Sequence, residues 1–85
     1  MLRLNSSASL AESAPWAPLG DFLLQVDQPD RTTVEIHARL ATDAPWVIMG
    51  AIREGGARIL RMDAVTEVKI LSRNPTGLPV RVWSD

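Results

Sequence analysis

The strongest constraint on this chain is a series of short segments in which apolar and polar residues alternate. Residues 32–40 are the clearest case, because Val34, Ile36 and Ala38 occupy every second position. Successive side chains of a strand point to opposite faces, so this spacing predicts a half-buried β-strand, whereas a helix would scatter the same residues around its axis. Strands are also expected at residues 21–27, 57–62, 66–72 and 78–83.

The most apolar run is residues 44–52, with the sequence Ala-Pro-Trp-Val-Ile-Met-Gly-Ala-Ile. A short apolar run bounded by turn formers is typical of a buried strand. We therefore expect a central strand here, with Trp46 as the largest single side chain of the core. Gly55 and Gly56 follow it, and adjacent glycines permit the positive φ values of a tight hairpin turn.

Turn formers separate these segments at short intervals, and a chain of 85 residues has room for one domain. The fold class expected is all-β: a small antiparallel β-sandwich or barrel, immunoglobulin-like or jelly-roll-like, of about six strands. Residues 1–20 are expected to form an extended N-terminal arm and residues 21–85 the sandwich domain.

The predicted arm is extended because Pro15 would stop any helix that begins near Ser9. Its apolar residues are too numerous for a purely solvated tail; they are Leu2, Leu4, Leu10 and Trp16. Two alternatives remain open besides a disordered arm: the segment packs back on its own sheet, or it reaches a neighbouring subunit.

Composition excludes several classes of function. The net charge of −1 argues against a general nucleic-acid binder or a protein of anionic membranes, both of which show a basic excess. No run approaches the roughly 20 apolar residues needed to span a bilayer, and no signal-peptide pattern is expected at the N-terminus. The absence of cysteine excludes disulfides and thiolate zinc sites.

No group of residues indicates catalysis. His37 is the only histidine and lies on the outward row of its predicted strand, between Glu35 and Arg39. A solvated position explains it better than an interface contact, a catalytic triad or a metal site. Asp27 and Asp30 fit a turn better than a calcium loop. We therefore expect no enzyme activity, no cofactor and no metal.

Exposed arginines and tryptophans are the remaining candidates for binding. Arg53, Arg58 and Arg61 surround the predicted glycine turn, where they would contact an acidic neighbour or a phosphate, or simply be solvated or paired. Trp83 shares its face with Arg81 and not with Val82, so it leaves the core. It would then make a protein or sugar contact, or cap the end of the sheet.

The order of these elements resembles small β-sandwich proteins of tailed-bacteriophage virions, namely capsid decoration (cement) proteins and the bases of head fibres. The residues that carry the resemblance are a Trp-x-x-x-Gly-x-Ile strand at Trp46, Gly50 and Ile52, the alternating strand before it, and the glycine-containing connection after it. The similarity covers roughly residues 20–84. Immunoglobulin-like modules of adhesins and carbohydrate-binding proteins show the same rhythm of strands.

The resemblance implies a non-enzymatic structural protein that decorates or cements a phage capsid, assembles in the host cytoplasm and forms homo-oligomers. Its partner would be the major capsid protein or another virion protein, with no nucleic acid and no membrane. The candidate interface residues are Leu2, Leu4, Leu10, Trp16, Arg53, Arg58, Arg61 and Trp83. The alternative function is a carbohydrate- or protein-binding module of a tail, neck or adhesin.

Overall fold

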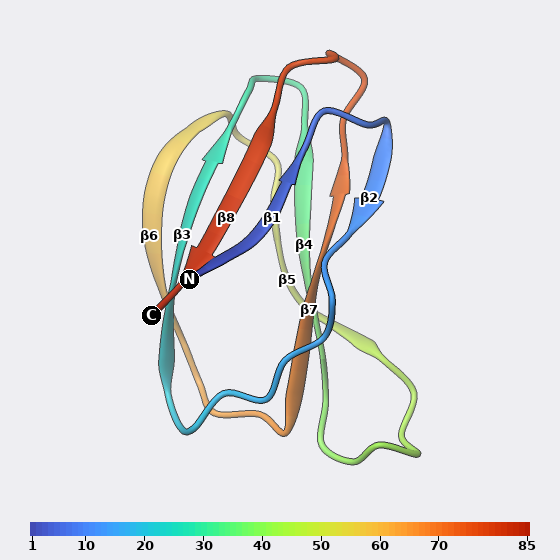
Figure 1. Cartoon of the computed structure of the whole chain (residues 1–85), viewed down its shortest axis with the longest axis vertical. Helices are drawn as coiled ribbons and strands as arrows, with labels where there is room; N and C mark the ends of the chain where they lie inside the picture. Colours follow the sequence, from blue (N-terminus) through green and yellow to red (C-terminus); the bar gives the residue numbers. More distant parts are fainter.

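The computed structural model describes all 85 residues as eight strands in two antiparallel four-stranded sheets (Figure 1). Sheet A has the order β1-β8-β3-β6, and sheet B has the order β2-β7-β4-β5. The strands are β1 (Leu2–Ser6), β2 (Leu10–Glu12), β3 (Phe22–Gln28), β4 (Thr33–Arg39), β5 (Val47–Ile52), β6 (Gly56–Met62), β7 (Glu67–Arg73) and β8 (Val80–Ser84). The predicted small all-β sandwich is confirmed, and no helix long and apolar enough to cross a membrane is present.

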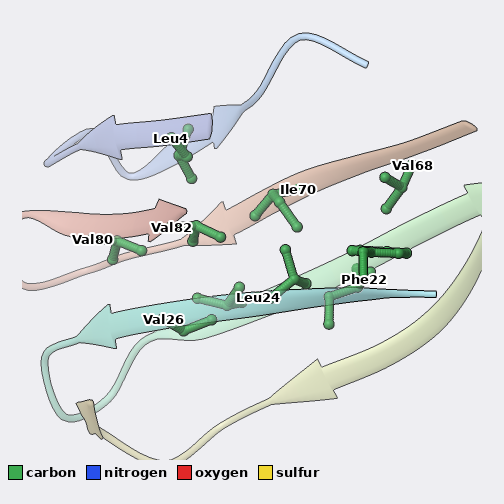
Figure 2. Packing of buried hydrophobic residues seen from close by; sticks show 10 residues of the cluster. Leu4, Phe22, Leu24, Val26, Val68, Ile70, Val80 and Val82 are labelled. Atoms are coloured by element: carbon green, nitrogen blue, oxygen red, sulfur yellow. The ribbon is translucent and has the colours of Figure 1, made fainter. Parts of the chain in front are cut away.

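The core fills the space between the two sheets, where the inward row of each central strand meets its counterpart (Figure 2). Leu24 and Val26 of β3 face Val34 and Ile36 of β4, and all four side chains have 2% exposure or less. The full cluster comprises Leu4, Phe22, Leu24, Val26, Val34, Ile36, Val68, Ile70, Val80 and Val82. Most members are β-branched, which suits the pleated surface of a strand.

The first 20 residues are extended as expected, but they are part of both sheets. β1 pairs with β8 at one edge of sheet A, and β2 pairs with β7 at one edge of sheet B. Leu4 enters the core, and Trp16 forms a bridge with Val68 through hydrogen bonds of 2.9 and 3.0 Å. The segment thus packs in cis and supplies two strands beyond the six expected.

The prediction of a central strand at residues 44–52 is wrong, because β5 lies at the edge of sheet B and pairs only with β4. Val47 and Ile48 are more than half exposed. Trp46 is outside the core as well. Its ring lies on the outer face of sheet B, 4.3 Å from the Arg39 guanidinium carbon and 4.7 Å from Lys69 Nζ. These cation–π contacts stabilise the ring on a face where it is only partly buried.

The predicted tight hairpin at Gly55 and Gly56 is also wrong, because β5 and β6 belong to different sheets. Only β4 and β5 are consecutive strands that pair with each other; every other connection passes from one sheet to the other. Gly56 has a φ of 120°, which favours glycine. Gly55 serves a different need: a Cβ at this position would lie 2.7 Å from the backbone nitrogen of Asp30.

We expect Gly55→Ala to lower the free energy of unfolding by about 2 kcal/mol, because the added methyl group must displace the backbone of the β3–β4 turn. Urea denaturation measures the change. Gly50→Ala is the matched control, since its Cβ would lie 3.7 Å from Ile36 Cδ1, an ordinary contact. Equal losses in the two variants would show that Gly55 is not required for this close approach.

Candidate interaction surface

The outer face of sheet A carries apolar side chains on all four strands, arranged around the polar Gln25. Leu2 of β1 is opposite Trp83 of β8, Trp83 is opposite Gln25 of β3, and Gln25 is opposite Ile59 of β6. Leu23 lies beside this row, one outward position away on β3. Leu2, Leu23 and Ile59 are 48%, 43% and 66% exposed. We call Leu2, Leu23, Ile59 and Trp83 the apolar row.

The row borders a shallow hollow of about 360 Å³. Trp83, Leu23 and Ile59 supply apolar walls, while Gln25 and Asp85 bring polar groups to it. Asp85 is fixed in place, because its Oδ1 accepts a 3.0 Å hydrogen bond from the Leu23 backbone nitrogen. The face therefore combines apolar area with a few polar groups, which is the composition of protein interfaces and ligand sites.

Charged side chains flank the apolar row on both sides. Arg81 pairs with Asp27 on one side, and the Arg81 guanidinium carbon lies 5.3 Å from the centre of the Trp83 ring. Arg61 is opposite Leu23 on the other side. Exposed apolar area with a polar rim is characteristic of surfaces that bind other molecules.

The outer face of sheet B is different, because its charges are paired within the chain. His37 Nε2 lies 2.9 Å from Glu35 Oε1, and Arg73 Nε donates to Glu35 Oε2 at 3.1 Å. Lys69 Nζ is 2.8 Å from Glu12 Oε1. A similar pair joins Arg39 to Glu67. The single histidine therefore lies on the outward row, as expected, and its ring is part of a hydrogen-bonded network that includes Glu35 and Arg73.

These contacts change the ionisation of two carboxyl groups. Hydrogen bonds from His37 and then Arg73 hold the pKa of Glu35 below its ordinary value of 4.5. The hydrogen bond from Lys69 is the main cause that lowers the pKa of Glu12. Both shifts favour the charged carboxylate, in keeping with its hydrogen-bonded partners.

The candidate residues chosen from sequence do not gather at one site. Leu2, Trp83 and Arg61 lie on the outer face of sheet A. Leu4 is buried in the core, and Leu10 is exposed on the short edge strand β2. Of these five residues, only Leu2, Trp83 and Arg61 lie on the same surface.

Trp16 and two of the arginines lie elsewhere. The Trp16 ring packs against the core between Arg3, at 4.3 Å, and the edge of Phe22. Arg58 faces inward, and its Nη2 donates to the Glu54 and Gly55 carbonyls at 3.0 and 3.1 Å. Arg53 is exposed just after β5. Arg53 and Arg58 line one hollow beside the glycine turn, while Arg61 lies on the outer face of sheet A, so the expected arginine cluster forms only in part.

Sequence reasoning missed Leu23, Gln25 and Ile59 as members of the surface. The signal for Leu23 is its parity, which is opposite to that of Phe22 and Leu24, so a leucine had to face outward. Ile59 gave no such signal, because both parities of β6 contain apolar residues and arginine.

No family model, curated protein or solved structure compared with this chain matches it. Across the whole structure, no group of three or more histidine, aspartate or glutamate side chains is placed to hold a metal ion.

The lowered pKa of Glu35 gives a test of the sheet B network. A carboxylate whose pKa is depressed on folding adds stability above its ordinary pKa and loses it as the pH falls through the folded value. We expect the free energy of unfolding to fall between about pH 5 and pH 3, and to fall less in Glu35→Gln. The matched control is Glu54→Gln, at an exposed carboxylate without an ion pair. Identical pH profiles for wild type and Glu35→Gln would contradict the assignment.

Proposed function

We propose that this chain is a non-enzymatic structural protein of a bacteriophage virion, which decorates or cements the capsid shell through contacts between subunits. The observation that carries the proposal is the apolar row on the outer face of sheet A. It provides exposed apolar area on a rigid sheet, with arginines and aspartates at its rim. The partner would be the major capsid protein or another virion protein, met in the host cytoplasm during assembly.

The apolar row supports attachment by surface area. Leu2, Ile59 and Trp83 would fill a complementary apolar surface of the shell, and large side chains at the centre of an interface contribute most of its binding energy. Arg61 and Arg81 at the rim would set orientation through acidic groups of the partner. Binding of this kind needs no reacting group.

The assignment to a virion rests on the resemblance of the strand pattern around Trp46 to phage decoration and head-fibre proteins. Many identical copies on a shell multiply a weak contact, so a modest apolar row on each copy suffices for stable attachment. The same reasoning favours a homo-oligomer that follows the symmetry of the shell.

A second candidate is a carbohydrate-binding module, favoured by the hollow beside Trp83. An aromatic ring next to Gln25 and Asp85 combines a stacking platform with hydrogen-bonding groups. Saturable quenching of tryptophan fluorescence by saccharides, lost in Trp83→Ala, would support this candidate over the structural one.

Density-gradient fractionation of a native lysate tests the leading proposal. We expect the wild-type chain to band with large particles in many copies, and Ile59→Lys to move to the light soluble fractions, because a buried unpaired ammonium group is costly at an interface. Leu78→Lys is the matched control, since Leu78 is 58% exposed in the β7–β8 connection, away from the apolar row.

The outcomes of this fractionation separate the alternatives. A wild-type chain found only in the light fractions would overturn the virion proposal. Wild type on particles with Ile59→Lys still attached would keep the virion assignment but reject the apolar row as the attachment surface.

A further inference from the structure

We propose that the free edge of β5 pairs with β5 of a second copy of this chain, in antiparallel orientation about a twofold axis. The inference goes beyond the function proposed above, because it does not depend on what the outer face of sheet A binds. It concerns a different surface, at the outermost strand of sheet B.

β5 is the one edge strand of the fold that carries no charged residue. Edge strands expose unpaired backbone N–H and C=O groups, and charged side chains on the strand are a common protection against unwanted pairing. β1 contains Arg3, β2 contains Glu12, and β6 contains Arg58 and Arg61. β5 has the sequence Val-Ile-Met-Gly-Ala-Ile. Its backbone edge is therefore open to another strand, apart from the bulge in its pairing with β4.

The side chains of β5 are also incompletely covered. Ile48 is opposite His37 on the outward row and is 59% exposed, and Val47 is 58% exposed. Met49 and Ile52 are only partly buried although they pack against the core. The most apolar run of the chain thus lies at a rim of the sandwich, where a second copy would cover it.

Charges at the two ends of β5 select the orientation. Asp43 lies in the connection before β5, which projects from the body of the molecule, and Arg53 follows β5 directly (Figure 1). Both are exposed, and neither forms an ion pair within the chain. Antiparallel pairing brings Asp43 of each copy to the end where the other copy has Arg53. Parallel pairing would place like charges together.

The symmetry of the pairing follows from the same residues. A twofold axis beside Ile48, which is 59% exposed on the outward row, pairs residues 47–49 of the two copies and brings the connection that holds Asp43 toward Arg53 of the other copy. A twofold contact uses the same surface on both copies, as closed homodimers do. The result would be a continuous eight-stranded sheet built from the two copies of sheet B.

Sedimentation velocity of the purified full chain over a concentration series tests the proposal. We expect a monomer–dimer equilibrium, and Ile48→Lys should raise the dissociation constant at least about tenfold. Leu78→Lys is the matched control, because it places the same charge at an equally exposed aliphatic residue in the β7–β8 connection, and it should leave the constant unchanged.

A charge swap tests the orientation without disturbing the strand. Asp43→Arg and Arg53→Asp should each raise the dissociation constant by roughly tenfold, since each creates two repulsive contacts per dimer. The double variant restores opposite charges and should return the constant to near the wild-type value. This rescue also guards against a single variant that weakens the dimer by misfolding.

A covalent probe reports the position of the axis. The chain has no cysteine, so oxidised Ile48→Cys should form a disulfide-linked dimer, while Ile59→Cys should not. A wild-type chain that stays monomeric at its highest soluble concentration would overturn the proposal. So would a dimer that Ile59→Lys dissociates and Ile48→Lys does not, because the copies would then meet through sheet A.

Discussion

The fold depends on the packing of two inward rows of mainly β-branched side chains against each other. Leu24 and Val26 from sheet A and Val34 and Ile36 from sheet B are removed from solvent only because the two sheets lie face to face. All but one of the connections pass between the sheets, so most strand pairs join segments that are not consecutive in the chain. The first 20 residues complete this arrangement by adding one edge strand to each sheet and Leu4 to the core. Removing these residues would take one edge strand from each sheet and expose part of the core. The segment is therefore an integral part of the fold.

The two outer faces have opposite characters. The charged side chains on the outer face of sheet B contact one another. Glu35 bonds to both His37 and Arg73, and Lys69 lies between Glu12 and the Trp46 ring. Covering such a surface with a partner removes the hydration of both charges of each pair, a cost that makes it a poor docking site. The face of sheet A has apolar side chains at its centre and charges only at its margin. This contrast and the uncharged edge of β5 are the observations on which the two proposed contact surfaces rest.

Sequence alone predicted the strands well, because the alternation of residues 33–39 and 67–73 has only one phase that buries the apolar side chains. It also placed Trp83 outside the core, through its parity with Arg81. It failed where tertiary context overrides the local pattern. The apolar run at β5 has the composition of a central strand, yet sheet order put it at an edge. The two glycines fit a hairpin, yet Gly55 is required for a close approach to Asp30, which is distant in sequence. Contacts between residues distant in sequence cannot be read from the pattern of a single segment. For the same reason the outward orientation of Ile59 was not predicted.

Oxidative footprinting of the three tryptophans tests the central claim most directly, because each lies on a different part of the molecule. Trp83 belongs to the outer face of sheet A, Trp46 to the outer face of sheet B, and Trp16 packs beside Arg3. The measurement compares the oxidation rate of each indole in the purified chain with its rate in the native assembly. We expect Trp83 to become protected on assembly while Trp46 keeps its reactivity. Protection of Trp46 with no change at Trp83 would contradict it, because the charge-paired face of sheet B would then be the surface that docks.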